Sequence, residues 1–269
     1  MRYCRAALIS AAILTLATAA EAQQDDTRHE EDHYNEGTFL LARGHCAAAI
    51  PCFSEAIRLN PEYAPAYFNR GLAHRNNGDL DEAISDFSRA ISLEPENADA
   101  YGNRGVAYQS RGDIHEAISD YGQVIRINPR DAKAYYNRGV ANQVAGNIER
   151  AIADYSRTIE LDSEHTDAYG NRAIAYHKQG DIGSAISDYS QVIRISPDDA
   201  NAYYNRGVAL SEQGDDGQAI SDFSQAIELD PNMASAFYNR AVVLKKMGST
   251  DGADDDLERA KKLDPSFSD

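Results

Sequence analysis

The sequence predicts an all-α protein, a solenoid built from seven repeated helix hairpins. The chain aligns with itself at a shift of 34 residues, and no insertion breaks the register. Each period contains two runs with apolar residues at helical spacing, separated by a glycine and a polar residue. A fixed period of this length indicates units that stack on their sequence neighbours, so the chain can lengthen without a single large core. The aligned segments start at Ala66, Ala100, Ala134, Ala168, Ala202 and Ala236.

One period, residues 100–133, illustrates how the sequence defines a hairpin. Gly112 can adopt the left-handed conformation that ends a helix, and Asp113 can cap the next one. The second helical run extends from Ile114 to Ile127, and Pro129 then prevents its continuation. The glycine recurs at Gly44, Gly78, Gly146, Gly180, Gly214 and Gly248, and the cap at Asp79, Asn147, Asp181, Asp215 and Ser249, with His45 in that place in the first unit.

The first 22 residues have the pattern of a secretory signal peptide. Arg2 and Arg5 precede an apolar stretch at residues 6–20, and an Ala-x-Ala cleavage pattern follows at residues 20–22. The apolar stretch is shorter than the roughly 20 residues of a spanning helix. We therefore expect cleavage before Gln23 and an exported bacterial protein, periplasmic or secreted, with no direct membrane insertion after cleavage.

The charge balance is strongly acidic and disfavours two classes of partner. Lys and Arg number 26 and Asp and Glu 43, which gives a net charge of -17. Nucleic acids and anionic lipid surfaces require clustered Lys and Arg, and the sequence contains no such stripe. We therefore expect no nucleic-acid partner and interpret the acidity mainly as solubility.

Two cysteines, Cys46 and Cys52, remain after the expected cleavage. On an unbroken helix their Cα atoms would lie roughly 9 Å apart, too far for a disulfide. Pro51 lies between them and can delay the start of that helix, and an oxidising compartment favours disulfides. The sequence therefore leaves a Cys46–Cys52 bond open.

The repeat resembles a known family. The second unit carries Gly71, Ala83, Phe87, Ala90 and Pro95 at the signature positions of tetratricopeptide repeat (TPR) proteins, whose period is 34 residues. The resemblance implies a right-handed superhelix, with first helices that line a concave surface for a protein or peptide partner. The expected organisation is a signal peptide at 1–22, a short linker at 23–29 and the solenoid at 30–267, with repeats at 30–63, 64–97, 98–131, 132–165, 166–199, 200–233 and 234–267.

The seventh repeat position carries arginine from the second repeat onward, where the family usually has leucine. An aspartate follows each arginine sixteen residues later, and the first repeat, with Glu36 and Cys52, lacks both. This joint presence and absence predicts an ion pair between the two helices of each repeat; a solvated charged face is the alternative. The predicted pairs are Arg70 with Asp86, Arg104 with Asp120, Arg138 with Asp154, Arg172 with Asp188, Arg206 with Asp222 and Arg240 with Asp256.

The sixth repeat position is always asparagine. A carboxamide both donates and accepts, so it can hold a peptide unit of any sequence. The row resembles the asparagine ladder of the repeat domain of protein O-GlcNAc transferase, which holds peptide backbone. Local helix packing, or recent duplication of repeats, is the alternative explanation. The predicted peptide-binding asparagines are Asn69, Asn103, Asn137, Asn171, Asn205 and Asn239, with Asn35 at the same position in the first repeat.

The fifth repeat position alternates in size. If this position faces the groove, Gly102 and Gly170 open shallow pockets between aromatic walls, and aromatic residues are common interface anchors. Duplication of repeat pairs would produce the same alternation. The predicted aromatic contacts are Phe68, Tyr136, Tyr204 and Tyr238. A carboxylate clamp, another binding mode of the family, is doubtful because Tyr34 and Thr38 replace its polar and basic residues.

The last repeat has the features of a solenoid end. Its second helix carries Asp254 and Lys261 where the other repeats from the second onward have isoleucine. A face without a following repeat must be polar, as in other capping units.

One catalytic pattern occurs at residues 29–33, where His-Glu-Glu-Asp-His matches the zinc-binding H-E-x-x-H pattern. No third ligand follows, and acidic residues also suit a helix start. We predict no cofactor and no metal site.

The preferred interpretation is a non-enzymatic adaptor that binds a peptide segment in its groove. A structural subunit of a cell-envelope assembly that uses its edges or convex face is the alternative, and a zinc-dependent hydrolase is remote. The sequence leaves the oligomeric state open.

Overall fold

The computed structural model describes residues 29–267, and these form helices with no strand. The chain divides after Pro129 into two compact units. The expected signal peptide and most of the linker lie outside the described residues. The first unit contains a helix over 29–42, α2 (Cys46–Leu59), α3 (Ala64–Asn77), α4 (Leu80–Leu93), α5 (Ala98–Arg111) and α6 (Ile114–Ile127). The second contains α7 (Ala132–Val144), α8 (Ile148–Leu161), α9 (Thr166–Gln179), α10 (Ile182–Ile195), α11 (Ala200–Gln213), α12 (Asp216–Leu229), α13 (Ala234–Lys246), α14 (Thr250–Leu263) and the 3-10 turn η1 (Pro265–Phe267).

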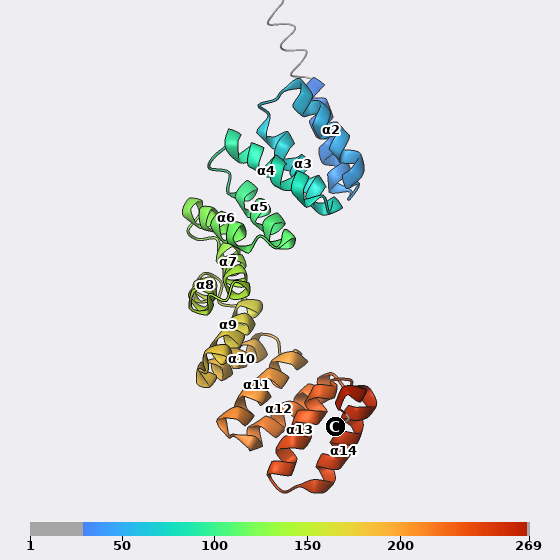
Figure 1. Ribbon diagram of the computed structural model, residues 1–269, viewed down its shortest axis with the longest axis vertical. Coiled ribbons are helices and arrows are strands. Elements are labelled where there is room, and N and C mark those ends of the chain that lie inside the picture. Colours follow the sequence, from blue (N-terminus) through green and yellow to red (C-terminus); the bar gives the residue numbers. More distant parts are fainter. Residues whose placement is uncertain (1–28, 268–269) are drawn as a thin grey trace, which may run out of the picture. The chain divides into compact units, whose positions relative to one another are not determined.

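Within each unit, consecutive helices form hairpins that stack in chain order (Figure 1). Each first helix contacts its own second helix and the second helix of the preceding hairpin in the same unit. First helices of neighbouring repeats also touch, as α7 does with α9 and α11 with α13. The fold is therefore the predicted all-α solenoid of stacked helix pairs.

The turns inside the hairpins use the predicted glycines. All seven glycines have positive φ, from 77° at Gly44 to 97° at Gly112, a region that other residues rarely adopt. The predicted caps differ among themselves. The side chains of Asp181 and Asp215 accept from backbone N–H groups of the helix that follows, while Asp113 occupies the same position and pairs with Arg111 instead.

In five of the hairpins that the structure describes, the core is an aromatic ring packed over a glycine of the first helix, and the other two have alanine at that position. Phe223 of α12 is buried, and a Cβ atom added at Gly207 of α11 would lie 2.9 Å from its ring. Phe87 packs in the same way on Gly71, where the added atom would lie 2.8 Å away. The small residue at the eighth repeat position is therefore required because the ring occupies the space of its side chain.

The two cysteines share one helix. Helix α2 begins at Cys46 and continues through Pro51, so the proline does not delay it. Both thiols are free, and the Cys52 Sγ atom lies 3.7 Å from the carbonyl oxygen of Ala48. The option of a Cys46–Cys52 disulfide is therefore excluded by the continuous helix, which separates the two residues by more than a full turn.

The end of the solenoid is polar, as the sequence indicates. Asp254 and Lys261 are exposed on α14, and Asp254 forms an ion pair with Lys245 at 3.1 Å. The turn η1 then returns Phe267 to the ring of Tyr238, with 4.9 Å between the ring centroids. No helix between residues 29 and 267 is long and apolar enough to cross a membrane.

Candidate functional site

The six arginines of the seventh repeat position each form a bidentate pair with the aspartate sixteen residues later. In the pair of Arg206 and Asp222, Nε donates to Oδ2 at 2.7 Å and Nη2 donates to Oδ1 at 2.8 Å. The aspartates are only 4–6% exposed. The bond to Asp222 raises the pKa of Arg206 above its ordinary value. The arginines thus join the two helices of each repeat; the equivalent bonds are those of Arg70, Arg104, Arg138, Arg172 and Arg240.

Most of these arginines also donate a hydrogen bond to a serine of the preceding repeat. Arg206 Nη1 donates to the hydroxyl of Ser190 at 3.1 Å, and that hydroxyl donates to the carbonyl of Ile186. The same contact links Arg70 to Ser54, Arg104 to Ser88, Arg172 to Ser156 and Arg240 to Ser224. At Arg138 the corresponding residue in the sequence is Gly122, which has no hydroxyl, and the buried amide of Asn142 instead donates to Asp154 at 3.0 Å.

The asparagines of the sixth position do not form a uniform ladder. Three of them donate to the phenol of the tyrosine 35 residues earlier, on the first helix of the preceding repeat, as Asn171 does to Tyr136 at 3.0 Å. The other two such pairs are Asn69 with Tyr34 and Asn239 with Tyr204, both at 2.9 Å. Asn103 has Phe68, which lacks a hydroxyl, 35 residues before it; its amide donates to the carbonyl of Asp99 and accepts from Arg75. Within residues 29–267, the amides of Asn35, Asn137 and Asn205 have no hydrogen-bond partner.

Rings at the fifth position are also covered from within the chain. The residue 29 positions later contacts the ring in three repeats; it lies just before the next first helix in two of them and in η1 in the last. The centroid distances are 5.1 Å for Tyr34 with Tyr63, 4.7 Å for Tyr136 with His165 and 4.9 Å for Tyr238 with Phe267. On their inner side, Phe68, Tyr136 and Tyr204 lie against Phe87, Tyr155 and Phe223 of the second helices.

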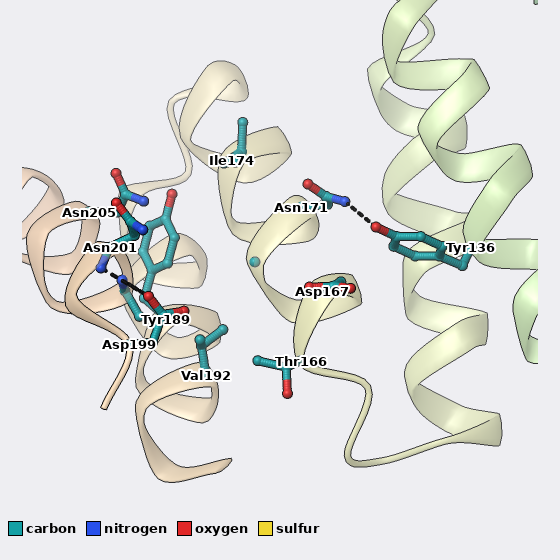
Figure 2. A pocket seen from close by; sticks show the side chains of 12 residues that line it. Tyr136, Thr166, Asp167, Asn171, Ile174, Tyr189, Val192, Asp199, Asn201 and Asn205 are labelled. Atoms are coloured by element: carbon teal, nitrogen blue, oxygen red, sulfur yellow. Dashed lines mark hydrogen bonds between the residues drawn. The ribbon is translucent and has the colours of Figure 1, made fainter. Parts of the chain in front are cut away.

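Gly170 interrupts this aromatic row and opens a cavity of about 320 Å³ in the second unit. A Cβ atom added at Gly170 would meet nothing within 4 Å. Figure 2 shows Asn171 turned towards Tyr136 of α7, while Asn205 of α11 lies across the cavity beside Tyr189. The full lining is Tyr136, Thr166, Asp167, Gly170, Asn171, Ile174, Tyr189, Val192, Asp199, Asn201, Ala202 and Asn205.

The lining divides by chemistry. Ile174, Tyr189 and the buried Val192 supply apolar surface, and burial raises the pKa of Tyr189 to about 12. Asp167 is exposed and Asp199 half-buried, and within residues 29–267 neither carboxylate forms an ion pair. Asp199 Oδ1 accepts from the backbone of Asn201 and Ala202, which fixes its position at the start of α11.

A smaller cavity of about 200 Å³ adjoins the first and shares Ile174, Tyr189 and Asn205 with it. Its other lining residues are His177, Lys178 and Val208. His177 Nε2 lies 2.9 Å from the carboxylate of Glu212. Asn205 therefore lines both cavities, one with Asp167 and Asp199 and the other with Lys178.

The structure gives the predicted residues different roles. Asn171, Asn239 and Asn69 hold tyrosines of the same chain, and Phe267 covers Tyr238. Tyr136, Asn171 and Asn205 meet at one cavity, where Asn205 has an unused amide. The paired asparagines were not distinguishable from the sixth position alone; the signal was the tyrosine 35 residues before each of them.

The H-E-x-x-H pattern contributes to the fold at the start of the first repeat. Glu30 is buried and accepts from the amide of Asn60 at 3.0 Å, so its carboxylate is part of the contact between the first helix and the end of α2. In the part of the chain that the structure describes, no group of three His, Cys, Asp or Glu side chains could hold a metal ion.

Models of the tetratricopeptide repeat match most of the described chain. They cover residues 34–100 and 74–113, then 98–131, 132–165 and 200–233, then 175–214, and finally 234–267. The chain belongs to the tetratricopeptide repeat family. No curated protein matches it.

Solved TPR structures share the fold. The crystal structure of MamA protein has 28% identity and a TM-score of 0.61, over 65% of this chain and 95% of that one. YrrB, described as a TPR protein with an unusual peptide-binding site, has 24% identity and a TM-score of 0.62, over 68% and 95%. The C-terminal part of a TPR protein from Cytophaga hutchinsonii has 18% identity and a TM-score of 0.77, over 87% and 96%.

Proposed function

We propose that this TPR protein binds an extended peptide segment of a partner along the first helices of its second unit, and that Asn205 holds the peptide backbone. The cavity at Gly170 carries the proposal, because it combines apolar surface, an open side and a carboxamide without an internal partner. Ligand sites in proteins commonly combine these features. The peptide-binding site described for YrrB, a protein of similar fold, supports the same use of the scaffold.

The geometry favours a backbone contact at Asn205. A carboxamide presents one acceptor and two donor hydrogens in a plane, so it can bond to both the N–H and the C=O group of a peptide unit. The amides of Asn171 and Asn239 already donate hydrogen bonds to Tyr136 and Tyr204, respectively. The side chain that projects from the held peptide unit can then enter the cavity beside it.

Capture from a cell-envelope extract tests this proposal, with residues 23–269 as bait. Asn205→Ala should lose a partner that the unchanged protein retains, while Asn239→Ala, the matched control at the same repeat position, should keep it. Both variants should retain their helical circular dichroism. A partner retained by all three proteins would contradict groove binding and would move the interaction to the edges or convex face, as a structural subunit of an envelope assembly requires.

We also propose that the protein acts outside the cytoplasm, in the periplasm or after secretion, because residues 1–22 have the signal-peptide pattern. Expression of the full chain in a bacterium should yield a periplasmic or secreted protein whose N-terminal residue is Gln23. Full-length protein that stays in the cytoplasm would refute export, and N-terminal sequencing distinguishes the two results.

A further inference from the structure

The aromatic residues of the fifth position and the residues 29 positions later change together. Where the fifth position is tyrosine, the later residue is a ring or a thioether, as in Tyr136 with His165 and Tyr204 with Met233. Where the fifth position is glycine, the later residue is aspartate, as in Gly170 with Asp199. The sequence repeats this combination at Gly102 and Asp131, and Phe68 with Asn97 fits neither class. Repeats with glycine at the fifth position therefore have an open space and a nearby carboxylate where repeats with tyrosine have a ring and the residue that covers it.

The Gly170 cavity has the chemistry to accept one kind of side chain. Its inner wall is apolar, from Ile174, Tyr189 and Val192, and two carboxylates, Asp167 and Asp199, line it without a cation among the described residues. No Lys or Arg belongs to the lining. A long side chain with an apolar stem and a cationic end matches both features, because the stem is buried and the charge stays near the rim.

We propose that the Gly170 cavity is a subsite for an arginine side chain of the bound peptide. This inference rests on the proposed function, since it assigns the side chain next to the peptide unit held by Asn205. The guanidinium group has five donors in a plane and is more weakly hydrated than an ammonium group, so it can donate to two carboxylates at a partly buried site. The Oδ1 atom of Asp199 accepts two backbone N–H groups, and its Oδ2 atom is available to the ligand.

The neighbouring cavity supports the assignment because it has a lysine and no carboxylate in its lining. It shares Asn205 with the first cavity and is also lined by His177 and Lys178. An arginine placed there would meet Lys178, and like charges disfavour that register. The two cavities therefore fix the position of a basic residue relative to the held peptide unit.

Selection of random peptides on the purified protein tests the subsite. We expect the peptides that bind residues 23–269 to share an arginine at one position. Replacement of that arginine by citrulline, which has nearly the same shape but no charge, should weaken binding on the order of tenfold or more. The variant Asp167→Asn with Asp199→Asn should bind the arginine and citrulline peptides equally, because the carboxylates are removed while the amide groups keep the shape.

The outcomes separate the subsite from the proposed function. Peptides that require Asn205 but show no preference for arginine would overturn the arginine subsite and leave groove binding intact. An arginine preference that persists in the double Asp→Asn variant would also overturn it. Failure to select any peptide whose binding depends on Asn205 would contradict the proposed function and the subsite together.

Discussion

Removal of Arg206 should destabilise the second unit because it leaves the carboxylate of Asp222 buried without its partner. The change Arg206→Leu deletes two short hydrogen bonds to Asp222 and one to Ser190. Asp222 is 6% exposed, so water can replace little of what it loses. Stranding one member of a buried ion pair costs about 3–5 kcal/mol. The Ser190 hydroxyl still donates to Ile186, so it adds little to this cost.

The double variant Arg206→Leu with Asp222→Leu should recover much of the loss, because no charge then remains buried. Thermal unfolding followed by circular dichroism measures the difference. A loss of about 3 kcal/mol lowers Tm by roughly 6–12 °C in a domain of this size. Amide hydrogen exchange in α11 and α12 assigns the effect to the second unit and does not require the two units to unfold together.

The exposed pair of Arg157 and Glu160 provides the control. Its 2.7 Å contact joins side chains that are 42% and 64% exposed, and surface pairs contribute about 0–1 kcal/mol. Arg157→Leu should therefore change Tm little. Equal losses in the single Arg206→Leu and the double variant would refute the buried-pair account, because they would show that the aspartate carries no penalty when its partner is absent.

Further predictions concern packing, ionisation and the contacts between repeats. Gly207→Ala should destabilise the fold by about 1–3 kcal/mol because its methyl group meets Phe223, whereas Gly170→Ala should stabilise it by about 0.5–1 kcal/mol; paired urea titrations measure both. The pKa of Tyr189 is raised, so its contribution to stability is complete below about pH 10 and is lost as the pH rises towards 12. Tyr189→Phe should flatten that alkaline loss in the same titrations. Ser190→Ala should cost about 0.5–1.5 kcal/mol, and no loss would show that its bond to Arg206 adds nothing.

The 34-residue period of the sequence was sufficient to predict the helix hairpins and the Arg–Asp ion pairs. Helix α6 spans Ile114–Ile127 as the apolar spacing predicts, because a helix between Gly112 and Pro129 has few alternative bounds. The Arg–Asp spacing of sixteen residues identified each bridge, since it recurs in every repeat that has the arginine. The serine contacts were not inferred, although the serine also lies sixteen residues from the arginine, in the preceding repeat.

The candidate site was predicted only in part. The binding of a peptide by the asparagines and rings of the sixth and fifth positions stays a prediction, and one repeat position cannot reveal hydrogen bonds between neighbouring repeats. Asn171 and Asn205 occupy the same repeat position. Their hydrogen bonds differ because the residue 35 positions earlier is Tyr136 for Asn171 and Gly170 for Asn205. The disulfide alternative at Cys46 failed for a local reason, since Pro51 is accommodated inside α2.

Closure of the Gly170 cavity tests groove binding most directly. Gly170→Tyr places in the cavity the residue that the chain itself uses at positions 136 and 204, and the site has room for it. Its phenol should accept from Asn205, as Tyr136 does from Asn171. Binding of a selected peptide should fall to background by fluorescence anisotropy while Tm stays the same or rises, and Gly217→Tyr on the exposed start of α12 should bind normally. Unchanged peptide affinity in Gly170→Tyr would contradict binding at this cavity.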